Sequence, residues 1–421
     1  MPLRQKIEQE IRSRGPIPFS RYMDLCLYDD EFGYYSRHAQ QFGKAGDFYT
    51  SSDVHAVFGR LLARQFDEMW RALGSPEQID VVELGPGRGL FAQDVLDWSE
   101  KKFPDFFRAL HYVLIERSPA LRRRIEATLS RHLHSGKAEI STPAAAPAPE
   151  YLLPPAAKRR KIAAHGASRG SPPHDEQAPQ GRKNQSSTET QTRETPSILF
   201  ANEFFDALPV EILSQQGSLR IDLREGRFVE TWAPPSPEEL EFLDRYSVHP
   251  EPGERLEVPV AAQQFANQIL SELPCGFFVA IDYGYTREEQ LAGRHRGTLK
   301  AIRQHSVSAN PYEAPGEQDI TADVNFTALA AAAEKYGMQT HKLITQSQFL
   351  LGIGEANEFA DAFEDCRLPQ ERAKVALQLK HLVTPAGMGE SFHVLVASKG
   401  VEQKKVDALA GLSFARNTAA R

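Results

Sequence analysis

Glu83, Gly85, Gly87 and Gly89 occupy alternate positions in the segment VVELGPGRGL. Glycines after a strand let the backbone turn sharply and approach a ligand where a Cβ atom would clash. A dinucleotide-binding loop has the spacing G-x-G-x-x-G, and here Leu90 stands where the last glycine of that pattern belongs. A carboxylate beside a phosphate is repelled, whereas one beside a cationic or amino-bearing ligand is stabilised. The spacing therefore favours a ligand that carries positive charge.

This pattern resembles the first motif of class I S-adenosylmethionine methyltransferases, in which the loop wraps the amino-acid end of the cofactor. In those enzymes a second acid, at the end of the next strand, accepts hydrogen bonds from the ribose hydroxyls. Here the apolar run HYVLIE ends at Glu116, 27 positions after Gly89. A carboxylate suits a vicinal diol because its two oxygens accept both hydroxyl hydrogens. The resemblance predicts S-adenosylmethionine as cofactor; the alternative is a tight strand–helix turn flanked by surface acids.

Longer stretches resemble the MidA-like methyltransferases, a family that includes the mitochondrial complex I assembly-factor methyltransferase. The stretches are GPIPFSRYMDLCLYDDEFGYYS (Gly15–Ser36), FGKAGDFYTSSDVHAVFG (Phe42–Gly59), ELGPGRG, NEFFDALPVE (Asn202–Glu211), IDYGY (Ile281–Tyr285) and DITADVNF (Asp319–Phe326). The resemblance covers roughly Ile7–Ser398. It implies a class I α/β methyltransferase fold with added helices and strands. For the mitochondrial member it also implies symmetric dimethylation of an arginine in a complex I subunit.

Three polar residues, Asn202, Glu203 and Asp206, follow the apolar run Ser197–Ala201. Ligands of open α/β sheets bind outside the carboxyl ends of the strands, so a methyl acceptor should approach here. Arginine pairs bidentately with carboxylates, which orient it and expose a nitrogen toward the methyl group. Glu203 and Asp206 are three apart, and we expect them to share a helical face and grip the acceptor. The alternative is that Asn202 or Asp206 caps a helix turn before Pro209.

Two further groups complete the predicted site. The family resemblance implies a lid over the cofactor, formed by Gly46, Asp47, Phe48 and Thr50. Asp282 and Tyr283 end another apolar run and are expected to reach the cleft and contact the substrate. Otherwise Tyr283 is a half-buried edge aromatic.

Short apolar runs alternate with helical spacings along the chain. The predicted strands are Ile79–Leu84, His111–Glu116, Ser197–Ala201 and Phe277–Asp282, with a last strand at His393–Ala397. Strands that alternate with helices predict a mostly parallel sheet of the α/β class. Turn signals at Gln216-Gly217 and Glu225-Gly226 predict an inserted β-meander. The predicted helices include a short one that ends at Gly15-Pro16, then Phe326–Tyr336, Glu358–Cys366 and Gln370–Val383.

Composition divides the chain into regions. Residues 141–196 hold nine prolines in 56 positions and few branched apolar side chains, which predicts a disordered insertion. We expect a helical and lid region at 1–76 and the cofactor-binding core at 77–140 and 197–398. Substrate-binding elements are expected within the core at about 210–275 and 300–390, and a tail at 399–421.

The charge balance and the cysteines exclude several classes of protein. Lys plus Arg number 49 against 56 Asp plus Glu, a net charge of -7, which argues against a general nucleic-acid binder. The three cysteines are far apart, so they form no disulfide framework and no CxxC metal pair. No run approaches the ~20 apolar residues of a membrane span. The first residues lack the apolar core of a secretory signal, and their acids argue against a transit peptide.

The leading interpretation is a protein-arginine methyltransferase whose acceptor is a partner protein, such as a respiratory complex I subunit. We expect a bacterial cytoplasmic enzyme, or a mitochondrial matrix enzyme if the chain is eukaryotic. Apolar helices near the C-terminus leave a homodimer open. The alternatives are a small-molecule methyltransferase and a non-catalytic assembly chaperone that retains a cofactor site.

Overall fold

The computed structural model describes residues 2–37, 56–142, 195–303, 306–308 and 310–419. The predicted lid residues Gly46, Asp47, Phe48 and Thr50 lie outside these ranges, and so does most of the predicted insertion.

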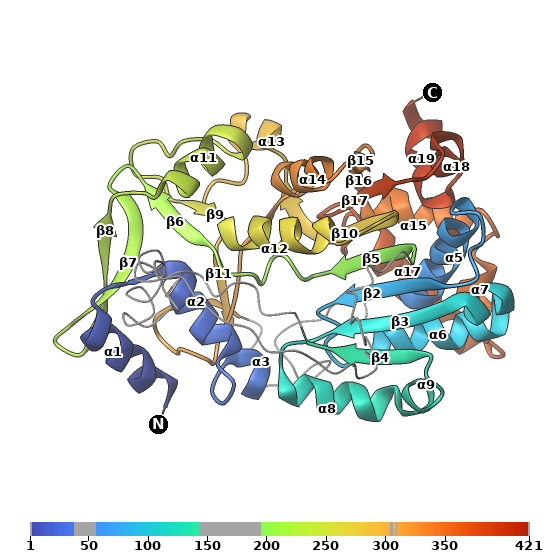
Figure 1. Cartoon of the computed structure of the whole chain (residues 1–421), viewed down its shortest axis with the longest axis horizontal. Coiled ribbons are helices and arrows are strands. Elements are labelled where there is room, and N and C mark those ends of the chain that lie inside the picture. Colours follow the sequence, from blue (N-terminus) through green and yellow to red (C-terminus); the bar gives the residue numbers. More distant parts are fainter. Residues whose placement is uncertain (1, 38–55, 143–194, 304–305, 309, 420–421) are drawn as a thin grey trace, which may run out of the picture. The chain divides into compact units, whose positions relative to one another are not determined.

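The largest sheet is mostly parallel, as the sequence predicts (Figure 1). Its strands run in the order β15 (Gln339–Thr340), β17 (Phe392–Lys399), β10 (Gly276–Tyr285), β5 (Ser197–Asn202), β2 (Ile79–Leu84), β3 (Leu110–Ile115) and β4 (Ala138–Ser141). The strands from β10 to β4 are parallel, whereas β17 runs antiparallel to β10. Two short strands join it, β14 (Val324–Asn325) beside β10 and β16 (Ile344–Thr345) beside β17. The α/β fold class is thereby confirmed.

Helices cover both faces of this sheet, which explains why its inner strands are continuously apolar. Ile198 and Phe200 of β5 face a cluster with α5 (Ala56–Ala72) and α6 (Leu90–Lys102). Leu199 and Ala201 face the opposite cluster, with α12 (Val260–Ser271) and α14 (Phe326–Lys335). The alternation follows from the two-residue period of a strand. Figure 1 shows α12 and α14 on one side of the strands and α6 on the other.

Helical crossovers connect the parallel strands. The helices α6 and α7 (Pro104–Ala109) lead from β2 to β3, and α8 (Pro119–Thr128) and α9 (Ser130–His134) lead from β3 to β4. This connectivity gathers the carboxyl ends of β2, β3, β5 and β10 at one edge of the sheet, where ligands bind in open α/β folds.

The predicted meander forms a second, antiparallel sheet with strands β1 (Ile17–Pro18), β7 (Gly217–Arg224), β6 (Glu211–Ser214) and β9 (Leu256–Val258), while β8 (Arg227–Ala233) pairs with β7. The N-terminal helices α1 (Leu3–Arg14) and α2 (Phe19–Tyr28) pack against it and bury Ile7 and Ile11. They are followed by α3 (Tyr34–Arg37). The remaining elements in this part are α11 (Pro237–Tyr246), α13 (Arg287–Leu291), β11 (Lys300–Arg303), β12 (Ser306–Ser308) and β13 (Asp319–Thr321).

The C-terminal region departs from the sequence prediction in two places. The helix expected at Glu358–Cys366 is only α16 (Ala360–Phe363), because Glu358 and Phe359 adopt positive φ of 54° and 57° and end the helical path before it. It lies between α15 (Gln346–Glu355) and α17 (Pro369–Val383).

The predicted C-terminal tail is not a tail in the structure. It forms α18 (Gln403–Asp407) and α19 (Ala410–Ala419), and Val406 and Leu409 are buried in the main core. The amides of Ala410 and Gly411 donate to side chains of α5, which ties this end to the sheet layer.

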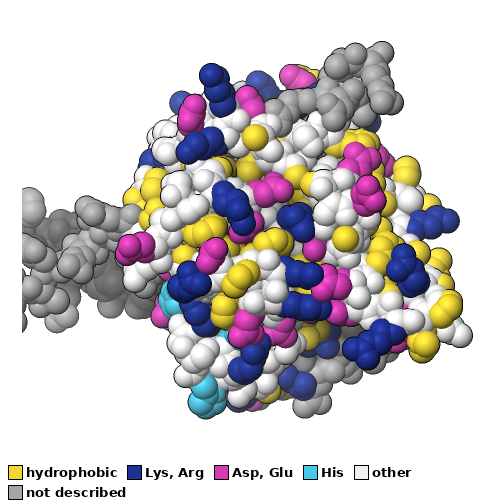
Figure 2. Space-filling view, turned by 90° about the vertical axis from the view of Figure 1, so that its right-hand side faces the viewer, with side chains coloured by type: hydrophobic (Ala, Val, Ile, Leu, Met, Phe, Trp, Pro, Cys, Tyr) yellow, Lys and Arg dark blue, Asp and Glu magenta, His cyan; other side chains and the backbone are white. Residues whose placement is uncertain are grey.

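The helices of the described ranges are too short or too polar to cross a membrane. Basic and acidic side chains alternate over the face shown in Figure 2. Ion pairs also link separate elements: Lys101 of α6 pairs at 3.2 Å with Glu364 and at 2.7 Å with Asp365, which directly follow α16.

Candidate functional site

The glycine loop follows β2 and ends where α6 begins. All three of its glycines adopt left-handed backbone conformations, with φ of 62°, 55° and 75° at Gly85, Gly87 and Gly89. L-residues with a side chain adopt this conformation only at an energetic cost of about 1–2 kcal/mol. The sequence therefore needs glycine at these positions for the turn itself.

The three glycines differ in what a side chain would meet. A Cβ atom on Gly85 would lie 2.7 Å from the Phe204 ring, and one on Gly89 would touch Ile125 of α8 at 3.4 Å. At Gly87 no heavy atom of the described chain lies within 4 Å of that position. The loop thus packs against the protein at both ends and leaves its middle glycine open, where a ligand can approach the backbone.

Glu83 lies in β2, just before the loop, and its side chain is buried. Its Oε2 accepts a hydrogen bond of 2.8 Å from the hydroxyl of Tyr112, which lies on the neighbouring strand β3. Burial raises the pKa of Glu83 to about 8, and the negative charge of Glu116 adds to the rise. A cationic group placed beside Glu83 would favour its ionised form.

Glu116 directly follows β3 and is also buried. Its Oε1 accepts the amide of Ser118, at the start of α8, at 2.7 Å. Burial raises the pKa of Glu116 to about 7, against the lowering effect of the amides of Ser118 and Arg117. The structure therefore holds two acids and an open glycine loop at adjacent strand ends, which fits a ligand with an ammonium group and a diol.

The predicted acceptor residues follow β5, but they form no helix. Residues 203–210 make an irregular turn, and Glu203 adopts a left-handed φ of 50°. Both the shared helical face and the helix cap were therefore wrong predictions, since the chain turns sharply at residue 203. The Glu203 amide still donates to the carbonyl of Ile281 at 3.0 Å, and the Asn202 amide group donates to Glu203 Oε1 at 3.2 Å.

Asp206 lies deeper than Glu203. Its carboxylate is buried and accepts a hydrogen bond from the hydroxyl of Tyr283. Its Oδ1 is buried and has no hydrogen-bond partner in the described part of the chain. Burial raises the pKa of Asp206, and Tyr283 partly opposes this rise. Lys300 covers the Tyr283 ring, with its ammonium 5.2 Å from the ring centre.

Asp282 lies within β10, three residues before its last residue Tyr285, and is 1% exposed. Its Oδ2 accepts the amides of Phe204, Phe205 and Asp206 at 3.2, 3.1 and 3.4 Å. Burial, together with the charges of Asp206 and Glu203, raises its pKa. The sequence predicted that Asp282 contacts the substrate directly, whereas the structure shows this carboxylate buried and occupied by backbone amides.

Sequence reasoning missed three tyrosines that the fold brings to the site. Tyr112 holds Glu83, while Tyr28 donates to the carbonyl of Ala207 at 3.0 Å and Tyr35 donates to Asp319 at 3.1 Å. Tyr28 and Tyr35 lie inside a stretch that carries the family resemblance, but nothing in their spacing indicates contacts with residues 179 and 284 positions away.

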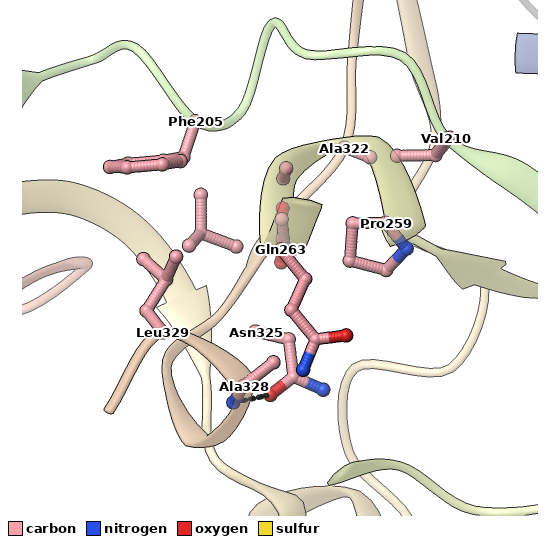
Figure 3. A pocket seen from close by; sticks show the side chains of 11 residues that line it. Phe205, Val210, Pro259, Gln263, Ala322, Asn325, Ala328 and Leu329 are labelled. Carbon is pink, nitrogen blue, oxygen red and sulfur yellow. Dashed lines mark hydrogen bonds between the residues drawn. The ribbon is translucent and has the colours of Figure 1, made fainter. Parts of the chain in front are cut away.

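A narrow cavity lies behind Phe205, between the first turns of α12 and α14 (Figure 3). Gln263 points into it, and Asn325 caps α14 through the amide of Ala328 at 2.9 Å. With about 10 Å³ of free space, it holds roughly one water molecule and is too small for a cofactor or an arginine side chain. Among the described residues, no group of three or more His, Cys, Asp or Glu is arranged to hold a metal ion.

The strand order, the open glycine loop and the two acids at adjacent strand ends define a class I methyltransferase. Residues 61–344 match the model of a family of S-adenosyl-L-methionine-dependent methyltransferases, and the chain belongs to this MidA-like family. The predicted enzyme class and cofactor are thereby confirmed.

The sequence is similar to those of named relatives over most of its length. The mitochondrial protein arginine methyltransferase NDUFAF7 homolog of Drosophila melanogaster is 29% identical over 96% of this chain and 86% of its own. NDUFAF7 of Xenopus tropicalis is 30% identical over 82% of this chain and 74% of its own. The crystal structure of a protein from Burkholderia thailandensis bound to S-adenosyl-homocysteine superposes on this chain with a TM-score of 0.73 and a sequence identity of 26%. The match covers 98% of this chain and 94% of the other chain.

Proposed function

We propose that this methyltransferase transfers the methyl group to an arginine of a partner protein, with Glu203 as the carboxylate that grips the acceptor. When bound, S-adenosylmethionine would supply an electrophilic methyl group, with S-adenosylhomocysteine as the second product. Glu83, Glu116 and the glycine loop Gly85–Gly89 would hold it. The residues of this chain would bind the guanidinium, align one of its nitrogens with the methyl group and receive the proton that this nitrogen loses.

The observation that carries this proposal is the position of Glu203. Glu203 is the first residue after β5, and β5 is the neighbour of β2 in the sheet. The next residue, Phe204, packs against Gly85 of the glycine loop. Asn202 holds one of its carboxylate oxygens. A guanidinium is a planar fork of donors that matches a carboxylate, whereas a lysine ammonium is a point charge.

Two further residues, Asp206 and Tyr283, support the proposed binding of the acceptor guanidinium. The buried Oδ1 of Asp206 offers an acceptor without a partner in the described chain, and Tyr283 holds the other oxygen. The names of the relatives support arginine as the acceptor residue. A respiratory complex I subunit is the partner we propose, in a bacterial cytoplasm or, in a eukaryotic cell, in the mitochondrial matrix.

The test is mass spectrometry of arginine methylation in cells with the gene, without it, and with the gene restored as Glu203→Gln. Glutamine keeps the volume but loses the charge, so methylation should fall about 10–100-fold, the range for a hydrogen bond to a charged group. Affinity for S-adenosylmethionine should stay within a few-fold, because its predicted contacts lie on β2 and β3.

Glu225→Gln is the matched control, since Glu225 also has a positive φ of 49° but lies exposed in the β7–β8 turn. Wild-type methylation by Glu203→Gln would remove Glu203 from the mechanism. Methylated lysine or a methylated metabolite as the only product would replace the arginine assignment, and cofactor binding without any product would favour the chaperone.

A further inference from the structure

The acceptor turn after β5 is held by a single carboxylate from the neighbouring strand. Three consecutive amides, those of Phe204, Phe205 and Asp206, converge on Asp282 Oδ2. The other oxygen, Oδ1, accepts the amide of Tyr283 at 3.0 Å. Asp282 thus receives four backbone hydrogen bonds, three from the turn after β5 and one from its own strand, and the bond from Asp206 is the longest of the three that share Oδ2.

The turn needs such support because its conformation is unfavourable by itself. Glu203 adopts a left-handed φ, which costs about 1–2 kcal/mol for a residue with a side chain. Strained positions of this kind persist where the surrounding structure holds them in place. Farther along the turn, Ala322 donates its amide to the Asp206 carbonyl at 3.0 Å and Tyr28 donates to the Ala207 carbonyl. Between Glu203 and this far end, Asp282 holds the amides of residues 204–206.

The position of Asp282 is electrostatically unfavourable for a carboxylate. Asp282 is buried close to two other acids, Asp206 and Glu203, whose charges repel its own. The amides of Asp206 and Tyr283 oppose part of this effect, because hydrogen bonds to a carboxylate favour its charged form.

We propose that Asp282 is a positioning residue: it fixes the turn 203–206 so that Glu203 and Asp206 face the methyl acceptor, and it does not touch the acceptor itself. This inference rests on the proposed function, because it assigns the acceptor grip to Glu203 and Asp206. It predicts that the loss of Asp282 lowers turnover far more than cofactor affinity.

The experiment compares the full-length wild-type protein with Asp282→Ala and Asp282→Asn. Three quantities are measured: calorimetric affinity for S-adenosylmethionine, amide hydrogen exchange at residues 204–206, and transfer of labelled methyl to protein extract from cells that lack the gene. Asparagine keeps one acceptor oxygen, so it tests the inference even if the alanine variant fails to fold.

We expect Asp282→Ala to speed exchange at residues 204–206 by more than tenfold and to lower methyl transfer about 100-fold, the size of effect of a small misplacement of reacting groups. Asp282→Asn should fall between alanine and wild type in both readouts. Cofactor affinity should change by less than threefold in each variant.

Glu257→Gln is the matched control for a purely structural loss. Glu257 is another buried carboxylate that holds loop amides, those of Thr298 and Leu299 at 2.9 and 3.1 Å, and it accepts none of the amides of residues 203–206. It should lose thermal stability without a loss of turnover beyond threefold. The inference is overturned if Asp282→Asn or Asp282→Ala loses no more turnover than this control, or if exchange at 204–206 stays as in wild type.

The proposed function fails on a different result, namely the absence of methylarginine in the product of the wild-type protein. Total methyl transfer and amide exchange report on Asp282 whichever residue receives the methyl group, so the two failures are distinguishable.

Discussion

Replacing Glu83 with glutamine should have opposite effects on the free protein and on cofactor binding. Glu83 is buried beneath the glycine loop, and glutamine keeps its size and an oxygen that can accept the Tyr112 hydroxyl. What the substitution removes is an ionisable group in a place that disfavours its charge. The variant therefore separates the energetic effect of burying this acid from its contribution to binding.

The magnitude follows from the pKa. Burial raises the pKa of Glu83 from its ordinary value of 4.5 to about 8. Between these values the unfolded chain has lost the proton that the native protein keeps, so wild-type stability falls as the pH rises through this window. Each pH unit within it corresponds to about 1.4 kcal/mol, and glutamine is free of this effect. Between pH 5.5 and 7.5 the stability of Glu83→Gln should therefore rise by about 2–3 kcal/mol relative to wild type.

Urea unfolding of the free proteins at these two pH values measures the difference. Glu77→Gln, an exposed acid just before β2, serves as the control and should show no such trend. Calorimetry should show that Glu83→Gln binds S-adenosylmethionine about 10–100-fold more weakly, because it offers the ammonium group no charge. A pH-independent difference in stability, or a variant less stable than wild type at pH 7.5, would refute the reasoning.

Further outcomes follow from the cofactor loop and the insertion. Gly87→Val should abolish measurable cofactor binding in calorimetry, whereas Gly136→Val, with a similar φ of 70° and equally open space, should carry the same backbone strain and bind normally. Glu116→Ala should lose about 1–3 kcal/mol of cofactor binding through the ribose hydrogen bonds, and unchanged affinity would contradict its assignment. Residues 143–194 should be cut first in limited proteolysis. Their replacement by a Gly/Ser linker of about 15 residues should leave the melting temperature nearly unchanged, whereas a large drop would show that they pack against the rest of the chain.

Much of the fold was predictable because its signals are local. The apolar run before the glycine loop became β2, and Glu116 follows β3 immediately, as the run HYVLIE indicated. A strand buried on both faces needs a continuous apolar run, and a turn into a helix needs glycine at positive φ, so both features are written in neighbouring residues. The same holds for the meander, whose turns the sequence marks with Gly217 and Gly226.

The C-terminal end shows where local signals were insufficient. Val406 and Leu409 are too few apolar residues to predict a packed helix, and α5 supplies the partners for this segment from more than 330 positions earlier. Tertiary contacts therefore turned a predicted tail into α18 and α19.

The amino-acid sequence alone indicated the class of enzyme and its cofactor, because several long motifs together with the acid and three glycines resemble a known methyltransferase family. It also predicted which residues of the glycine loop contact the cofactor. Only the tertiary structure decided where the two proposed acceptor acids lie. Glu203 and Asp206 looked equivalent at three positions apart, yet a left-handed turn separates them and buries Asp206 against Tyr283. The sequence predicted that Asp282 contacts the substrate. In the structure, the register of β10 beside β5 directs its carboxylate to the backbone amides of the turn after β5. Such directions depend on contacts between segments about 80 residues apart, which no local pattern records.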